Sequence, residues 1–142
     1  MSNLSHNFRE QLKEIPIHPL KIINENISRT KKTQKYLFQL SSGKLIESVL
    51  MKEGKRVTAC LSTQVGCAVD CGFCATAKMG FIQNLTSGEI LDQYLHLQKL
   101  SEYKITNIVF MGMGEPFLNY DNTIKSANLL HHPKGINMGA WR

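Results

Sequence analysis

The distribution of apolar and polar residues in the middle of the chain predicts three consecutive strands. Residues 36–40 and 44–51 are the first two, and the polar stretch 41–43 between them predicts a turn. A second turn at 52–55 precedes a third strand at 56–62. The first two strands are therefore expected to form a β-hairpin.

The N-terminal part of the chain has a less regular pattern. Residues 6–14 predict a short helix, with Phe8, Leu12 and Ile15 near one face. Two prolines then interrupt the chain. The polar residues 20–34 are expected to form loop or weakly structured chain.

Strands and helices alternate in the second half of the sequence. The expected order is strand, loop, helix, strand, loop, helix, over residues 56–62, 66–80, 87–101, 105–111, 112–116 and 120–130. Thr86 and Glu89 have the spacing of a capping box, which marks the start of the first of these helices. Alternation of this kind indicates βα units and a parallel sheet, hence an α/β fold.

Composition and charge narrow the function classes only slightly. The chain has 142 residues, 42% of them hydrophobic and 20% charged, and no apolar run approaches the roughly 20 residues that cross a membrane. The polar N-terminus lacks the apolar segment of a signal peptide, so we expect a cytoplasmic protein without membrane contact. A net charge of +6 favours anionic partners such as nucleic acid. The local basic cluster formed by Arg29, Lys31, Lys32 and Lys35 fits a solvated surface and a phosphate contact equally well.

The four cysteines carry the clearest chemical signal. They are Cys60, Cys67, Cys71 and Cys74, all within fifteen residues, whereas the cysteines of a disulfide scaffold are spread along the chain. The spacing Cys67-x3-Cys71-x2-Cys74 lets three thiolates of one loop bind three irons of a [4Fe–4S] cluster and leaves the fourth iron open. A zinc site built from all four cysteines and a ferredoxin-type electron carrier are the alternatives, but paired zinc knuckles and the local four-cysteine run are both missing.

A second candidate segment follows the strand expected at 105–111. Residues 111–116 read Met-Gly-Met-Gly-Glu-Pro, and ligands of parallel α/β folds bind beyond the carboxyl ends of strands. Glycines at this place let a ligand approach the backbone, and Glu115 can accept a hydrogen bond from a ligand ammonium group. Taken alone, such a segment is more often only a turn.

Three segments together resemble a known family. Residues 60–81, residues 84–90, and residues 111–116 with Asn119 and Tyr120 are similar to the radical S-adenosylmethionine (SAM) enzymes that methylate C2 of adenosine in ribosomal and transfer RNA. The resemblance implies a truncated, partial (βα)6 radical-SAM barrel preceded by a small β-hairpin element. Residues 1–34 then correspond to a helical and loop remnant of an accessory domain, and residues 35–142 to the hairpin with the first two βα units.

The resemblance also implies roles for individual residues. The matched positions are the cluster ligands Cys67, Cys71 and Cys74, the SAM-binding residues Gly114 and Glu115, the general base Glu47, and Cys60, which helps to release the methylated RNA. Without the resemblance, Glu47 is an ordinary surface carboxylate of a strand, and Cys60 is a small buried residue.

The family chemistry uses one SAM to methylate a later cysteine and a second SAM to generate the radical that activates this methyl group. Its implied cofactors are the [4Fe–4S] cluster and SAM. Its implied partners are ribosomal RNA, transfer RNA and a flavodoxin or ferredoxin as reductant, and we expect a monomer. A disulfide bond is also expected.

This chain departs from the family pattern in two ways. No cysteine follows Cys74, and family members are much longer, so we expect the barrel to continue beyond Arg142 and this chain alone to be unable to methylate RNA. Two other hypotheses remain at this point: a methyltransferase that modifies C8 of adenosine in ribosomal RNA and confers antibiotic resistance, and a non-enzymatic iron–sulfur or zinc-binding module.

Overall fold

The computed structural model describes residues 4–13 and 19–139. Its helices and strands are α1 (His6–Lys13), β1 (Lys21–Ile27), β2 (Thr33–Gln39), β3 (Leu45–Glu53), β4 (Arg56–Cys60), β5 (Gln64–Gly66), β6 (Phe81–Asn84), α2 (Ser87–Leu100), β7 (Asn107–Val109) and α3 (Tyr120–His131). Two short 3-10 helices lie at Ala77–Met79 and Pro116–Asn119. None of the helices in these described ranges is long and apolar enough to cross a membrane.

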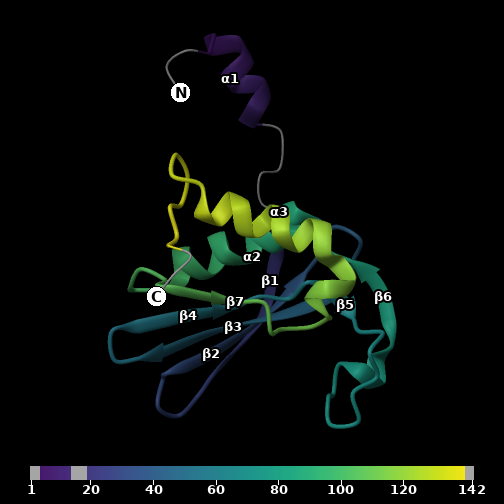
Figure 1. Cartoon of the computed structure of the whole chain (residues 1–142). Coiled ribbons are helices and arrows are strands. Elements are labelled where there is room, and N and C mark those ends of the chain that lie inside the picture. Colours follow the sequence, from purple (N-terminus) through teal and green to yellow (C-terminus); the bar gives the residue numbers. More distant parts are fainter. Residues whose placement is uncertain (1–3, 14–18, 140–142) are drawn as a thin grey trace.

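The central sheet has five strands in the order β1-β2-β3-β4-β7 (Figure 1). Strands β1 to β4 form an antiparallel meander, and β7 adds to β4 in parallel. Helix α2 lies in the connection from β4 to β7, and α3 follows β7. The expected hairpin, β2–β3, and the expected βα alternation with a parallel strand pair are therefore confirmed.

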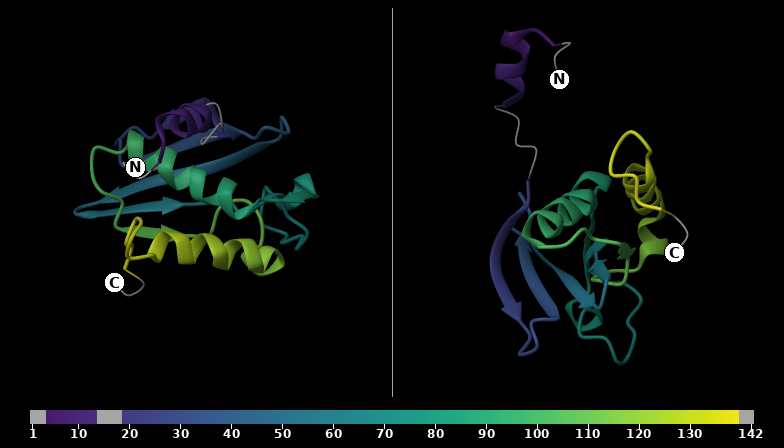
Figure 2. Two further views of the ribbon diagram at one scale, coloured as in Figure 1. Left: turned by 90° about the horizontal axis from the view of Figure 1, so that it is seen from above. Right: turned by 90° about the vertical axis from the view of Figure 1, so that its left-hand side faces the viewer.

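Helices α2 and α3 cover one face of this sheet (Figure 2). The alternation along β3 places Ile46, Ser48 and Leu50 in the interior, and Ile46 packs in one core cluster with Phe38 of β2. Phe38 has no exposed surface, so its burial contributes on the order of 2–3 kcal/mol. This apolar layer fixes the sheet against α2.

The start of α2 agrees with the capping box expected from the sequence. The Thr86 hydroxyl accepts a hydrogen bond from the Glu89 N–H at 3.2 Å, and the Glu89 carboxylate accepts one from the Thr86 N–H at 2.8 Å. Such a cap stabilises a helix by about 1 kcal/mol. It also fixes where the chain enters α2 after β6.

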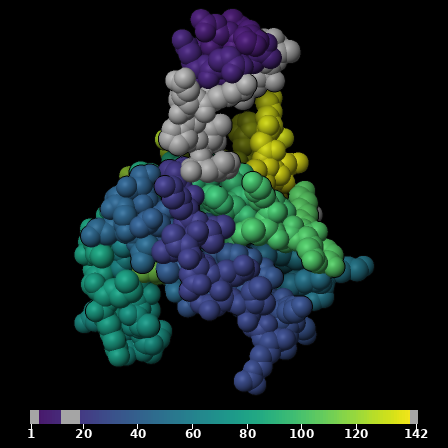
Figure 3. Space-filling model, turned by 180° about the vertical axis from the view of Figure 1, so that it is seen from behind, coloured from purple at the N-terminus to yellow at the C-terminus, as the bar shows by residue number. Residues whose placement is uncertain are grey.

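The prediction for residues 20–34 was wrong, because this segment contains β1. All seven residues of β1 are exposed, and the strand lies at the edge of the sheet, where it pairs with β2. Without a buried face, the strand has no apolar alternation in its sequence. Figure 3 shows it on the surface of the molecule. Part of the segment 1–34 thus belongs to the central sheet.

The predicted helix at 6–14 is confirmed as α1, at His6–Lys13. Residue Ile15 lies outside the described part of the chain, and so does the side chain of Leu12. The strand expected at 105–111 is present as the shorter β7.

Candidate functional site

The loop that carries Cys67, Cys71 and Cys74 is closed at its base by a small antiparallel pair, β5 and β6. Gly66 pairs with Phe81, and the Cys67 N–H donates to the Gly80 carbonyl at 3.0 Å. The loop extends to the side of the central sheet away from α2 and α3, and it forms a separate lobe in the space-filling view (Figures 1, 2 and 3).

Gly66 is needed for this closure. Its φ is +74°, and a Cβ built on it would lie 1.8 Å from the Gly80 carbonyl oxygen. Because that oxygen belongs to the backbone, no side-chain movement can relieve the overlap. The glycine before the first cysteine therefore serves the packing of the loop base.

Inside the loop, the backbone turns sharply between the cysteines. Asp70 has a φ of +52°, and the Cys74 N–H donates to the Cys71 carbonyl at 3.0 Å. The N–H groups of Ala77 and Thr76 donate to the Cys74 sulfur and lower the pKa of that thiol. The loop thus stabilises thiolate at Cys74, which is the form that binds metal.

All four cysteines are free thiols, so the disulfide bond expected from the resemblance is not present in the structure. Cys67, Cys71 and Cys74 are partly exposed, whereas Cys60 is buried in β4. Among the described side chains, no group of three or more His, Cys, Asp or Glu is arranged around a point that could hold a metal ion. The cysteines that bind a [4Fe–4S] cubane do not surround one common ion, because each of them binds a different iron.

The segment Gly112–Glu115 is hydrogen-bonded to the residues that lead into the cysteine loop. The N–H groups of Thr63 and Gln64 donate to the Met113 carbonyl at 2.9 and 3.1 Å, and the Glu115 N–H donates to the Gln64 side-chain oxygen at 2.9 Å. The structure therefore brings the two segments singled out in the sequence together, with Gln64 only three residues before Cys67.

The glycines of this segment allow the close approach. Gly114 has a φ of +96°, and a Cβ on it would lie 2.4 Å from the Cβ of Gln64. A Cβ on Gly112 would lie 2.7 Å from the Ser62 hydroxyl oxygen. At both positions the space of the missing side chain is taken by the 61–64 segment of the protein itself.

The Glu115 carboxylate caps the 3-10 helix that follows it. Its Oε1 accepts a hydrogen bond from the Phe117 N–H at 3.0 Å, and Pro116 occupies the first helical position. This bond fixes the direction of the carboxylate at the carboxyl end of β7.

Two buried amides that the sequence reasoning missed hold the site together. The Gln93 side chain accepts from the Ser48 hydroxyl at 2.7 Å and from the Ser62 N–H at 2.8 Å, and it donates to the Ser62 carbonyl at 3.0 Å. Asn119 donates to the carbonyls of Thr63 and Leu85 at 2.7 and 2.8 Å. The sequence signal for Gln93 is only a polar residue on the inner face of a helix, and the signal for Asn119 is only its place in the family resemblance.

Glu47 and Cys60 lie on the same face of the central sheet. Val49 pairs with Cys60 across β3 and β4, and Glu47 is two residues from Val49, so the three side chains point the same way. This face is opposite to Ile46, which packs in the helix-covered core. Glu47 and Cys60 therefore face the side of the sheet on which the cysteine loop extends (Figure 2).

The two residues have different surroundings on that face. Glu47 forms an ion pair with Lys35 of β2, with 2.9 Å between Oε1 and Nζ, and 42% of its side chain is exposed. Cys60 is 8% exposed, and burial raises the pKa of its thiol, although the Met111 N–H acts in the opposite direction. Burial thus favours the protonated form of the Cys60 thiol.

The fold of this chain is also found in a solved structure. A radical SAM methyltransferase from Sphaerobacter thermophilus superimposes with a TM-score of 0.90 at 42% sequence identity, over 99% of this chain and 42% of that one. The fold is therefore that of part of a radical SAM methyltransferase.

Sequence relatives identify the family more closely. A probable dual-specificity RNA methyltransferase RlmN from Thermotoga maritima is 51% identical over 143 residues, and one from Aquifex aeolicus is 45% identical over 146 residues. No profile of a protein family matches the chain. The chain belongs to the dual-specificity RNA methyltransferase family of these relatives. It matches over its whole length, and it spans 42% and 41% of the length of these two proteins.

Proposed function

We propose that the protein of which this chain forms a part is a radical SAM enzyme that methylates C2 of adenosine in ribosomal and transfer RNA. One observation carries the proposal: the Gly112–Glu115 segment is hydrogen-bonded to the residues that lead into the cysteine loop. This contact puts a candidate SAM-binding segment beside a candidate cluster loop, at the carboxyl end of the two parallel strands.

In this proposal Cys67, Cys71 and Cys74 hold a [4Fe–4S] cluster. The donor set fits, because three free, partly exposed thiols lie on one loop whose base is closed by Gly66 and Gly80. When bound, such a cluster supplies the one-electron cleavage of SAM. Cys60 is not a ligand in this account, since it is buried in β4 outside the loop.

Gly114 and Glu115 bind the methionyl end of SAM. The Phe117 N–H orients the Glu115 carboxylate through Oε1, which leaves Oε2 to accept a hydrogen bond from the SAM ammonium group. The contact of Gly114 with Gln64 fixes the backbone at this point, so the ligand meets a preformed surface.

Glu47 removes the C2 proton of the target adenine, and Cys60 takes part in releasing the methylated RNA. Both side chains face the same side of the sheet as the cysteine loop. The ion pair with Lys35 positions the Glu47 side chain at the sheet surface, and a general base at that position can accept a proton. Cys60 must become accessible before it reacts, because it is almost fully buried.

The partners follow from the same chemistry. The substrates are ribosomal and transfer RNA, with the net charge of +6 favouring a polyanion. A flavodoxin or ferredoxin supplies the electron, and the enzyme acts as a monomer in the cytoplasm.

Anaerobic reconstitution tests the cluster. We expect about four irons with matching sulfide per chain and a change in the visible spectrum when SAM is added. Cys71→Ala should abolish iron binding, and the matched variant Cys60→Ala should retain it. One zinc per chain, or equal iron loss in the two variants, would contradict the assignment.

The position of methylation needs a second measurement, because C8 methyltransferases share the cysteine motif. The Gly-Glu-Pro sequence at 114–116 resembles the C2 group. Mass analysis of adenosine from RNA treated with the full-length protein should give 2-methyladenosine, whereas 8-methyladenosine would support the alternative.

A further inference from the structure

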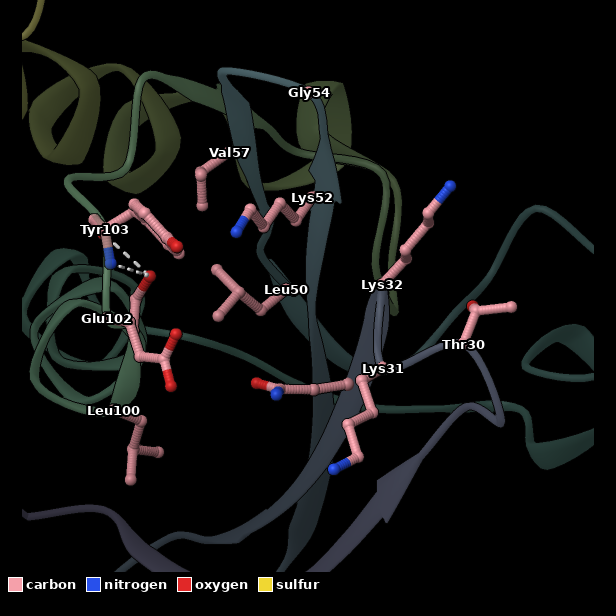
Figure 4. Close-up of a pocket in the computed structure, with 12 residues that line it drawn as sticks. Thr30, Lys31, Lys32, Leu50, Lys52, Gly54, Val57, Leu100, Glu102 and Tyr103 are labelled. Carbon is pink, nitrogen blue, oxygen red and sulfur yellow. Dashed lines mark hydrogen bonds between the residues drawn. The ribbon is translucent and has the colours of Figure 1, made fainter.

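A cavity of about 440 Å³ lies at the end of the central sheet away from the Gly112–Glu115 segment. Three separate parts of the chain line it: the β1–β2 turn, the β3–β4 hairpin and the loop between α2 and β7 (Figure 4). Its charged lining residues are Lys31, Lys32, Lys52 and Glu102. Three lysines and one glutamate therefore line this space.

The backbone holds these lysines at fixed positions. The Lys52 N–H donates to the Lys32 carbonyl at 2.7 Å, which ties the two hairpins together. Lys31 has a φ of +56°, a conformation that residues with side chains rarely adopt, and its N–H donates to the Ser28 carbonyl at 2.8 Å. The sheet thus fixes the backbone positions of the three lysines that line the cavity.

The Lys52 side chain is held in the cavity by an aromatic ring. Its Nζ lies 3.5 Å from the centre of the Tyr103 ring, and Figure 4 shows it pointing toward that ring. Tyr103 is in turn fixed by its backbone, because its N–H and its carbonyl both bond to the Ser101 hydroxyl, at 3.3 and 2.7 Å. Lys32 points away from Tyr103, toward solvent.

None of the three lysines forms an ion pair within residues 4–13 and 19–139. Lys35, which is close in sequence, instead pairs with Glu47. Among the residues that the structure describes, no ion pair neutralises these lysines, so the lining keeps a net positive charge that favours an anion.

We propose that this cavity binds a backbone phosphate of the RNA substrate, with Lys31 and Lys52 as its principal contacts. The inference rests on the proposed function, since that function supplies RNA as the anion. Lys52 is five residues from Glu47 along β3, or about 17 Å at the rise of a strand. A structured RNA can span this distance, so one part of it can occupy the cavity while another part reaches the face of the sheet that carries Glu47.

The test is fluorescence anisotropy with a short, fluorescein-labelled RNA stem-loop, at a series of KCl concentrations. The double variant Lys31→Gln/Lys52→Gln should bind roughly tenfold more weakly, and the slope of log K against log salt should fall by about one for each lysine removed. Lys52→Arg should keep most of the affinity, because it retains the charge and the contact with the ring.

The matched control is Lys125→Gln/Lys134→Gln, which removes the same charge from α3 and the turn after it, outside the cavity. An equal loss in both double variants would overturn the proposal, because a general charge effect would then explain it. Binding of inorganic pyrophosphate at the cavity, with no effect of the lysine variants on RNA affinity, would also overturn the proposal.

Cluster assembly is measured separately on the same proteins. If the cluster assembles but the Lys31→Gln/Lys52→Gln variant binds RNA as the unmodified protein does, only the phosphate site is refuted. A protein whose RNA affinity depends on these lysines, but which assembles no cluster, refutes the proposed radical chemistry and leaves the phosphate site standing.

Discussion

Replacement of Gly66 by alanine isolates the contact that closes the cysteine loop. The new Cβ would lie 1.8 Å from the Gly80 carbonyl oxygen, so the two backbone segments must move apart. This movement breaks the hydrogen bond from the Cys67 N–H to Gly80. The control is Gly43→Ala in the β2–β3 turn, because Gly43 has a similar φ of +78° and nothing within 4 Å of its Cβ position.

The magnitude follows from these two sites. Both variants carry the cost of a left-handed alanine, about 1–2 kcal/mol. Gly66→Ala adds a backbone overlap, about 1–3 kcal/mol, and a lost hydrogen bond, about 1 kcal/mol. Its free energy of unfolding should therefore fall by about 2–4 kcal/mol more than that of Gly43→Ala.

Urea unfolding followed by circular dichroism measures the difference, and thermal unfolding should show a melting temperature lower by roughly 10 °C. Gly66→Ala should also lower the iron content after reconstitution, which Gly43→Ala should not. Equal destabilisation in the two variants would refute the reasoning, because the loop base would then be able to relax around a side chain.

Two further predictions concern buried groups. Gln93→Leu should lower the free energy of unfolding by about 3–5 kcal/mol in a urea titration, because it leaves the Ser62 backbone groups without partners. The control is Lys99→Leu, on the exposed side of the same helix. An equally small effect in both variants would contradict this prediction. Cys60, studied with the three loop cysteines replaced by serine, should be alkylated by iodoacetamide with a pH midpoint above that of the same protein unfolded in urea, since burial raises its pKa. Mass spectrometry measures the extent of alkylation at each pH. A midpoint equal to or below that of the unfolded protein would show that the thiol is not shielded.

Local signals in the sequence were sufficient for much of the fold. The capping box of Thr86 and Glu89 located the start of α2, because both partners lie within one turn. The alternation in β3 predicted its strand, since one face of it is buried. The strand β1 escaped prediction for the opposite reason: an edge strand with both faces exposed has no pattern to detect.

The site was predictable only in its residue types. The cysteine spacing and the Gly-Glu-Pro segment stand out in the sequence, but their connection through Gln64 depends on a contact between residues 51 positions apart. In the sequence alone, the glycines at 112 and 114 indicate openings for a ligand. The structure shows that the 61–64 segment fills these spaces, a fact that no local pattern contains.

The alternation along β3 has an evolutionary consequence. Ile46 and Ser48 point into the core, while Glu47 and Val49 point to the opposite side. Neighbours in the sequence are therefore subject to different constraints, one set from packing in the core and the other from the opposite side of the sheet. A lineage can vary one set while the other is conserved, so new specificities can arise on this scaffold without loss of the ability to fold.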